Sequence, residues 1–261
     1  RLLCPGEAGA ECLTRAQVTS VQAIYAGLKD ASGQHYAPPF PLGHEGGPSG
    51  WRAWITGNEP PVAQADGTLA FGGARLPASY GFTESNFRFL ALDDDAPGFT
   101  WRRFRYPQDL PRLATMSEIL SPLDPDLRPF RKAGGKLVVY HGWADPGISA
   151  LGTLDYIERM TRLVGGQDAA DQFTRTYFVP GMHHCSGGPG LDQFDMLTVL
   201  ERWVEQGEAP GHVVATRVEN GVTVRSRPLC PHPSVAVYSG AGSIDEAASF
   251  TCRAPGVSAA R

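Results

Sequence analysis

The sequence predicts an α/β fold, in which a parallel sheet with flanking helices follows a long irregular segment. Between residues 136 and 206, two short apolar runs alternate with two amphipathic stretches in the order strand, helix, strand, helix. This order and spacing are typical of a βαβ unit with parallel strands. Residues 37–109, in contrast, are interrupted by Gly and Pro and are rich in aromatic rings. We therefore divide the chain into an insertion over residues 1–123 and a regular core over residues 124–261.

The composition restricts the class of protein. With 261 residues and 42% hydrophobic content, the chain can bury a large core, and its 19% charged content is low for a disordered protein. A net charge of −4 gives no support to binding of nucleic acid or of an anionic membrane. The longest apolar runs, such as 137–140, are too short to cross a bilayer. We expect neither nucleic acid nor membrane as a partner.

The first helix is predicted from its capping residues. Thr14 can cap the helix, and Gln17, three residues later, completes a capping box. Apolar residues then recur at helical spacing at Val18, Val21, Ile24, Tyr25 and Leu28.

From Ala37 to Asp109, paired Pro and Gly residues interrupt any long element. The aromatic residues of this stretch are Trp51, Trp54, Phe71, Tyr80, Phe82, Phe87, Phe89, Phe99, Trp101, Phe104 and Tyr106. An irregular, ring-rich segment ahead of a regular core is typical of a lid or substrate-recognition insertion. The alternative is that the rings form a small core of the insertion itself, which we expect for most of them.

Regular elements are predicted from residue 124 onward. In order, they are a short helix over 127–133 broken by Gly134-Gly135, a buried strand over 136–140, a helix over 150–163, a second buried strand over 175–179, and a closing helix over 193–206 ended by Gly207. Two further strands, 213–218 and 222–227, flank Asn220-Gly221, which is a strong signal for a type I′ hairpin.

The five cysteines point to an oxidising compartment. Cys4 and Cys12 flank a short Gly-containing loop, and Cys230 and Cys252 lie in the Pro- and Gly-rich C-terminal tail. Both pairs suit local disulfides of a secreted or periplasmic protein. Cys185 is then left over, and an odd cysteine in such a protein suggests a partner outside the chain. The alternative is a set of five free, buried thiols.

The residues that carry chemistry follow the two core strands. His-Gly-Trp-Ala-Asp-Pro at 141–146 comes after the first strand, and Gly-Met-His-His-Cys at 181–185 comes after the second. Asp145 and His184 are roughly 40 residues apart, the length of one strand–helix–strand crossover, so both should reach the same sheet edge. There the carboxylate would orient the imidazole, whose other nitrogen accepts the proton of a nucleophile. Acid before base is the order found in α/β-hydrolases.

A nucleophile to complete this pair is not evident. An elbow needs a serine in a Gly-x-Ser-x-Gly turn between a strand and a helix. Ser49, Ser149 and Ser186 do not complete that pattern. The chain also begins abruptly at Arg1 without a signal peptide. We therefore expect a processed or excised part of a longer protein, whose serine lies outside this chain.

Other interpretations of these residues stay open at this point. Asp145, followed by Pro, can be only a turn or helix-cap residue, and His183 can be the base instead of His184. His183, His184, Cys185 and Asp145 can also be taken together as zinc ligands, although adjacent His-His-Cys is poor tetrahedral spacing. The acidic run at 93–95 is expected to be a solvated turn, because the remaining ligands of a metal site are absent. We predict no metal ligands in this chain.

The chain resembles the C-terminal part of the tannase and feruloyl esterase family, which also contains bacterial mono(hydroxyethyl) terephthalate hydrolases. The stretches that carry the resemblance are 3–4, 12–14, 17–18, 50–55, 141–146, 181–185, 187–190 and 203–210. They extend over essentially the whole chain, and the His-Cys motif followed by glycines is specific.

The resemblance implies a role for each residue of the site. In that family the nucleophilic serine directly follows a cysteine, and that cysteine is disulfide-bonded to the one directly after the catalytic histidine. By resemblance, Asp145 is the triad acid, His184 is the base, and Cys185 is one half of the active-site disulfide. The Cys-Ser elbow, most of the central sheet and the family's structural calcium site would precede Arg1. No cofactor is implied for catalysis.

The expectation is therefore the C-terminal part of an α/β-hydrolase, with a lid over 1–123 and a core ending in a hairpin and a disulfide-linked tail. The parent would be a secreted or periplasmic serine esterase that cleaves galloyl, feruloyl or terephthaloyl esters through an acyl-enzyme, with Trp51 or Trp54 stacking on the substrate ring. This chain alone would be inactive. The alternatives are a serine peptidase of the same fold, against which the cysteine after His184 argues, and a non-catalytic fragment that binds aromatic ligands.

Overall fold

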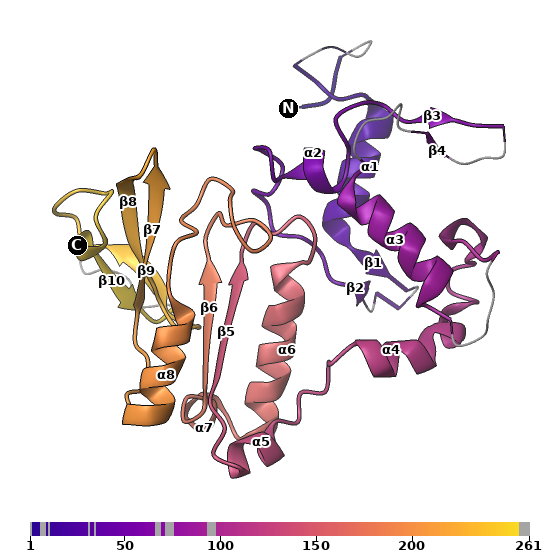
Figure 1. Ribbon diagram of the computed structural model, residues 1–261. Helices are drawn as coiled ribbons and strands as arrows, with labels where there is room; N and C mark the ends of the chain where they lie inside the picture. The colour runs from indigo at the N-terminus through magenta and orange to yellow at the C-terminus, as the bar shows by residue number, and fades with distance from the viewer. Residues whose placement is uncertain are drawn as a thin grey trace.

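The computed structural model describes residues 2–5, 9, 11–30, 32–33, 35–65, 69–70, 76–92 and 98–255. Figure 1 shows the chain as two parts, with residues up to 120 at the upper right and the sheet-containing part from 128 onward at the lower left. An extended connection joins them. Phe71, Gly72, Gly73 and the acidic run 93–95, all considered in the sequence analysis, lie outside the described residues.

Helix α1 (Arg15–Ala26) begins at the predicted residue. The Gln17 backbone N–H donates to Thr14 Oγ1 at 3.2 Å, and the Thr14 N–H donates to Gln17 Oε1 at 2.8 Å. These two bonds are the predicted capping box, and they satisfy backbone donors that the first helical turn leaves unpaired.

The insertion contains one long helix that the sequence analysis missed, α3 (Ala78–Phe89). Its local signals are weak, since it follows Pro77 without a side-chain cap and has Gly81 near its start. Phe87 packs on Phe104, with ring centroids 5.1 Å apart, so contacts with a later segment stabilise the helix. The other elements of this part are β1 (Leu28–Lys29), β2 (His35–Ala37), α2 (Trp51–Trp54), β3 (Val62–Ala63), β4 (Leu69–Ala70), η1 (Trp101–Arg103), η2 (Leu110–Leu113) and α4 (Ala114–Leu120).

The core contains the predicted βαβ unit. Strands β5 (Leu137–Gly142) and β6 (Thr174–Val179) pair in parallel, with Leu137 opposite Thr174 and Gly142 opposite Val179. Helix α5 (Arg128–Lys132) precedes β5, and α6 (Ala150–Leu163) and α7 (Gln167–Ala170) connect β5 to β6. The Leu151 N–H donates to Ser149 Oγ at 3.2 Å and so caps α6.

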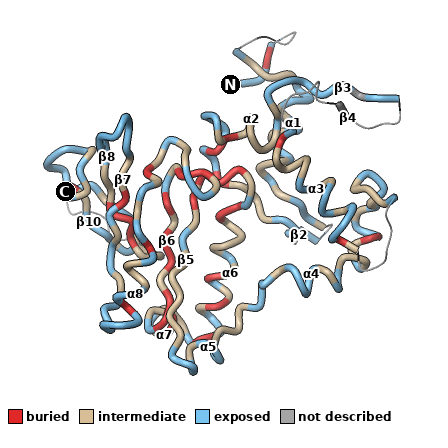
Figure 2. Tube along the Cα trace, viewed as in Figure 1, coloured by how far each residue is buried: buried red, intermediate tan, exposed pale blue. Residues whose placement is uncertain are grey.

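Two apolar clusters pack on opposite faces of this sheet. One consists of Tyr177, Val179, Met182, Leu191, Met196, Ala215 and Leu229, and the other of Ile157, Met160, Val164, Ala170 and Phe173. Val138 packs on the first and Val139 on the second, as the alternation of side chains along a strand requires. Figure 2 shows the buried residues concentrated along β6 and in the loops at its carboxyl end.

Strand β5 is less buried than predicted. Tyr140 of β5 is 48% exposed, whereas Tyr177 of β6, its partner in register, is fully buried. The reason is that Tyr177 is covered by its apolar cluster, which includes Ala215 and Leu229, and its hydroxyl donates to Gly211 O at 2.7 Å.

Helix α8 (Met196–Gln206) begins later than predicted, because Asp195 caps it and accepts from the Thr198 N–H at 3.0 Å. Gln193, the predicted first residue, instead forms a bridge with Thr216. Gly207 ends the helix in the left-handed conformation, with φ 73°.

The chain ends in two antiparallel pairs. Strands β7 (Val213–Glu219) and β8 (Val222–Leu229) flank Asn220 and Gly221, whose φ values of 50° and 80° confirm a turn with two positive φ angles. Strands β9 (Val235–Tyr238) and β10 (Phe250–Arg253), with η3 (Ala247–Ser249) before β10, form the second pair.

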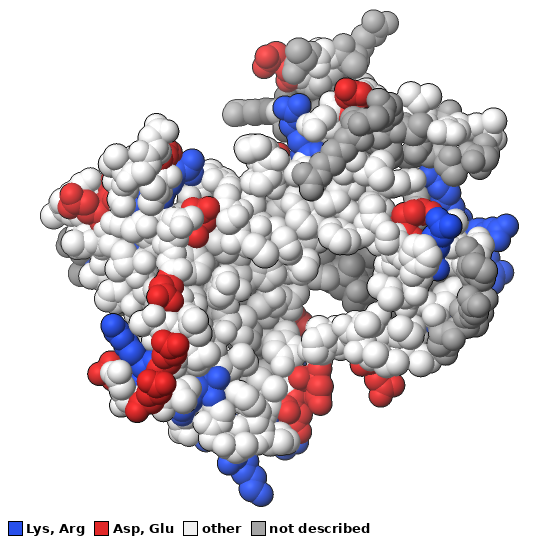
Figure 3. Space-filling view, in the orientation of Figure 1, with Lys and Arg blue, Asp and Glu red and all other residues white. Residues whose placement is uncertain are grey.

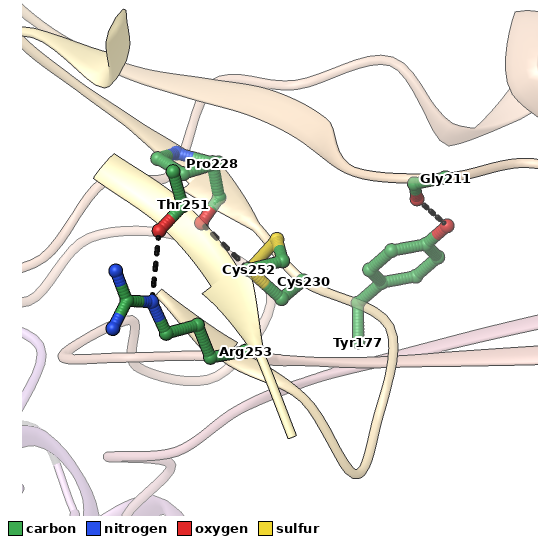
Figure 4. The surroundings of a disulfide bond; sticks show 7 residues. All are labelled: Tyr177, Gly211, Pro228, Cys230, Thr251, Cys252 and Arg253. Carbon is green, nitrogen blue, oxygen red and sulfur yellow. Dashed lines mark hydrogen bonds between the residues drawn. A yellow bond between two sulfur atoms is a disulfide. The ribbon is translucent and has the colours of Figure 1, made fainter. Parts of the chain in front are cut away.

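A disulfide links Cys230, just after β8, to Cys252 in β10 (Figure 4), and a second joins Cys4 to Cys12 near the N-terminus. Both are the pairs predicted from the sequence. In the part of the chain described here, no helix has the length and apolar character needed to cross a membrane.

Candidate active site

The candidate site lies in the two loops at the carboxyl ends of β5 and β6 (Figure 1). Parallel pairing continues beyond the strands, because the Trp143 N–H donates to Val179 O at 2.9 Å and the Ala144 N–H to Met182 O at 3.1 Å. These bonds hold the loop that carries Asp145 against the loop that carries His184.

Asp145 and His184 form a hydrogen-bonded pair. His184 Nδ1 is 2.9 Å from Asp145 Oδ2, with the Asp145 side chain 4% exposed and the His184 side chain 32% exposed. An ionised carboxylate can only accept, so Nδ1 carries the proton and the neutral ring keeps a lone pair on Nε2. This is the tautomer that a general base of a triad needs.

The Asp145 carboxylate is held in its charged form by four donors. Oδ1 accepts from the backbone N–H groups of Gly147 at 2.7 Å and Ile148 at 3.0 Å, and Oδ2 accepts from His184 and His141. Burial by itself raises the pKa of this carboxyl, but the hydrogen bonds, led by that from His141, outweigh burial and hold the pKa at about 2. Asp145 is therefore an anion throughout the physiological range.

His141 is a residue of the site that the sequence analysis quoted in its motif but gave no role. Its Nε2 lies 3.2 Å from Asp145 Oδ2 and 3.0 Å from Ile148 O, and its Nδ1 lies 2.7 Å from Thr153 Oγ1 on α6. Because both neighbours of Nε2 are acceptors, Nε2 carries the proton, and the Thr153 hydroxyl donates to Nδ1. The sequence signal that could have identified His141 is its position at the end of the strand, four residues before Asp145.

Of the two predicted aromatic residues, the structure brings Trp54 to His184. Their ring centroids are 4.7 Å apart in an edge-to-face arrangement. Trp54 also covers Gly147, where a Cβ would lie 2.5 Å from Trp54 Cζ3. Trp51 is turned to the insertion instead, since its indole N–H donates to His44 Nδ1 at 2.8 Å.

His183 is not the histidine that meets Asp145. It is fully buried, and its Nδ1 is hydrogen-bonded to Ser49 Oγ at 2.8 Å. Burial lowers the pKa of His183, and a backbone interaction with Ser49 and the charges of Asp145 and Glu45 offset part of this effect. His183 is therefore neutral at neutral pH and joins the insertion to the loop of His184.

Two of the three serines considered as nucleophiles, Ser49 and Ser149, have other side-chain partners in the described residues. Ser49 pairs with His183, and the Ser149 hydroxyl donates to Pro39 O at 2.5 Å. Among the residues that the structure describes, the His184 ring is hydrogen-bonded to Asp145 and not to a serine.

Cys185 has a free, exposed thiol beside His184. Its φ of 63° is unusual for a residue other than Gly, so its backbone is held in a strained conformation directly after the histidine. The disulfides Cys4–Cys12 and Cys230–Cys252 lie near the two ends of the described chain. No group of three or more His, Cys, Asp or Glu residues is arranged to hold a metal ion in the ranges that the structure describes.

Comparison with known proteins gives relatives along almost the whole chain. A sequence model of the family described as "Tannase and feruloyl esterase" matches residues 1–253. Mono(2-hydroxyethyl) terephthalate hydrolase of Piscinibacter sakaiensis is 36% identical, over 97% of this chain and 44% of that protein. An uncharacterized esterase of Xanthomonas campestris is 32% identical, over 96% and 48%, and feruloyl esterase B of Aspergillus niger is 26% identical, over 97% and 47%. The chain spans about half the length of these curated relatives.

Solved structures share the fold. An esterase from Aspergillus oryzae has a TM-score of 0.74 at 24% identity, and feruloyl esterase B from Aspergillus oryzae has 0.70 at 23%. Each covers 97% of this chain, which covers 49% of each of them. The likeness confirms the predicted α/β class, of the α/β-hydrolase-like type. Since the family match extends over 1–253 and two relatives exceed 30% identity, the chain belongs to the tannase and feruloyl esterase family.

Proposed function

We propose that this chain is the acid–base half of a serine esterase that hydrolyses esters of aromatic acids. The observation that carries the proposal is the Asp145–His184 pair, hydrogen-bonded at 2.9 Å, with the free Nε2 on a ring that is 32% exposed. The family description and the names of the relatives, which include feruloyl esterase B, support the same chemistry.

In the proposed mechanism, His184 Nε2 takes the proton of a serine hydroxyl as that oxygen attacks the ester carbonyl. Asp145 stabilises the imidazolium, which then protonates the leaving alcohol and leaves the acid bound to the serine. His184 next deprotonates a water molecule that attacks this acyl-enzyme. The returning proton restores the serine and frees the aromatic acid.

Trp54 is the proposed contact for the aromatic ring of the substrate. It already packs edge-to-face on His184, at 4.7 Å between centroids, so a ring stacked on it would lie beside the base. Trp51 is a weaker choice, because its N–H is used by His44. Galloyl, feruloyl and terephthaloyl esters all present such a ring, and the contact does not distinguish among them.

The serine is proposed to come from an N-terminal part that packs on β5 and pairs covalently with Cys185. The uncovered side of the core is apolar, with a groove of ≈ 430 Å³ lined by Val138, Tyr140, Phe194, Asp195, Met196, Leu197 and Leu200. Figure 3 shows few charged side chains in the middle of this view of the molecule. An apolar face of this kind suits burial against further protein. The family's structural calcium site is proposed to belong to that part as well.

The division into a lid over 1–123 and a core over 124–261 is part of the proposal. The lid role of the first part is supported by the contact of its Trp54 with His184 of the core. The two disulfides support a secreted or periplasmic location, since such bonds persist in oxidising compartments.

The test uses methyl ferulate and methyl gallate with this chain alone and with the chain extended by its N-terminal part. We expect turnover only in the extended form, and Asp145→Asn and His184→Ala to lower kcat by about 10³-fold or more. The matched control is Asp155→Asn on the exposed face of α6, which should leave kcat unchanged. Turnover by the chain alone would place the nucleophile inside it. Cleavage of peptides but not of aromatic esters would favour the peptidase alternative.

The covalent partner of Cys185 has its own test. Intact mass of native material, with and without reductant, should show a second polypeptide released from Cys185 if the two parts are separate chains. If they form one chain, peptide mapping should find Cys185 joined to the cysteine before the serine. A free Cys185 in active enzyme would contradict the proposed disulfide.

A further inference from the structure

The base His184 is contacted by a segment far away in sequence, residues 44–54 of the insertion. Trp54 at the end of α2 packs on the His184 ring and covers Gly147 beside Asp145. The position of this one side chain therefore affects both loops of the candidate site. Something must hold α2 against these loops.

The hydrogen bond between Ser49 and His183 provides that connection. Ser49 lies two residues before α2, and His183 directly precedes His184, yet Oγ and Nδ1 are 2.8 Å apart across 134 positions of sequence. His183 is fully buried, and its Nε2 has no partner in the described residues. Ser49 is thus the side-chain partner on which this buried ring depends.

The packing around this bond leaves no spare room. A Cβ on Gly187 would lie 2.8 Å from Ser49 Oγ, and one on Gly188 would lie 2.7 Å from His183 Cδ2. Both glycines also have positive φ, so at both positions a side chain would be disfavoured by the backbone as well as by its neighbours. Trp51, the first residue of α2, donates its indole N–H to His44. The two hydrogen bonds together hold the N-terminal end of α2 and the turn before it.

We propose that Ser49 and His183 are positioning residues, which hold Trp54 on the ring of His184 and so fix the orientation of the base. The inference rests on the proposed role of His184. Displacement of a catalytic group by about 1 Å can cost about a hundredfold in rate. The Ser49 hydroxyl and the His183 imidazole touch no reacting atom. They would affect the rate through the positions of the Trp54 and His184 rings.

The test compares four variants of the intact chain: Ser49→Ala, His183→Leu, His183→Asn and the control Ser20→Ala. Asn places an amide where Nδ1 stood and can keep the bond to Ser49, whereas Leu cannot. Ser20, on exposed α1, loses an equivalent hydroxyl that donates to Ala16 O. The readout is the nuclear Overhauser cross-peak between the Trp54 indole and the His184 ring, which does not need turnover.

We expect the cross-peak to be lost in Ser49→Ala and His183→Leu and kept in His183→Asn and Ser20→Ala. In the extended, active form, kcat should fall about tenfold in the first two variants and be restored by Asn. Persistence of the cross-peak in the first two, or equal loss in His183→Asn, would overturn the proposal. Because the cross-peak is independent of ester hydrolysis, failure of the esterase assignment would be seen separately in the Asp145 and His184 variants.

Discussion

At the residue scale, the site is organised around the balance of forces on Asp145. Burial opposes the charge of this carboxylate, and four hydrogen bonds favour it. His141 and His184 share one oxygen, so each ring orients the carboxylate that the other uses. The network extends through His141 to Thr153 on α6, which ties the acid to a rigid helix.

This network predicts coupled losses of stability. We expect His141→Leu and Thr153→Val each to lower the free energy of unfolding by about 1–3 kcal/mol, because each leaves a buried polar partner unpaired. The double variant should lose less than the sum, since both changes break the same chain of bonds. Urea denaturation of the four proteins measures this, with Thr19→Val on exposed α1 as control. Additive losses would mean that the two side chains act independently.

A second prediction concerns acid stability. The folded pKa of Asp145 is about 2, below its ordinary value of 3.8, so the unfolded chain takes up the proton first as the pH falls. The carboxylate thus contributes stability above about pH 4 that is lost as the pH falls toward 2, about 2 kcal/mol in total. Asp145→Asn removes this contribution. The difference in unfolding free energy between the two proteins should therefore narrow between pH 5 and pH 2, and a constant difference would contradict the assignment.

At the element scale, helix ends with local signals were predictable and helices without them were not. The capping box of α1, the serine before α6 and the glycine after α8 all depend on residues within a few positions of the helix end. Helix α3 lacks such signals and depends on rings that come from later in the chain.

The end of α8 offers a direct measurement of a backbone effect. Gly207 has φ 73° and open space around its Cβ position, so Gly207→Ala changes the backbone preference without a clash. We expect a loss of about 1 kcal/mol, since the left-handed conformation disfavours residues with a Cβ. Gly211→Ala is the matched control, because Gly211 also has open space but no positive φ. Thermal denaturation of both variants measures the two losses of stability. Equal losses would contradict a role for the left-handed conformation of Gly207.

At the scale of the whole molecule, the two parts of the chain meet at the site. The segment before and within α2 supplies Ser49 and Trp54, and the core supplies Asp145, His183 and His184. Figure 2 shows buried residues where these loops come together. Neither part builds the site alone.

The disulfides test how the C-terminal strands depend on the core. Replacing Cys230 and Cys252 by Ser opens a link across 22 residues and should cost about 3 kcal/mol. We expect faster hydrogen exchange in β9 and β10 but not in β5 and β6. The matched control is the Cys4 and Cys12 pair, which spans 8 residues and should cost less. Unchanged exchange in β9 and β10 would show that these strands are held without the disulfide.

By itself, the sequence determined the features that depend on residues close together in the chain. Alternating apolar runs predicted the βαβ unit, and parallel strands bring their carboxyl ends to one edge, so Asp145 and His184 were expected to meet. The hairpin at Asn220 and the two local disulfides follow from equally short-range signals.

Only the tertiary structure decided which side chains surround that pair. Trp51 and Trp54 lie on the same short helix, and the packing of the insertion on the core, not the sequence pattern, turns one to His44 and the other to His184. His183 and His184 are adjacent, yet His183 is hydrogen-bonded to Ser49, 134 positions away, whereas His184 is hydrogen-bonded to Asp145. The physical reason is that contacts between distant segments depend on how buried faces fit together, and no pattern within a short stretch of sequence encodes that fit.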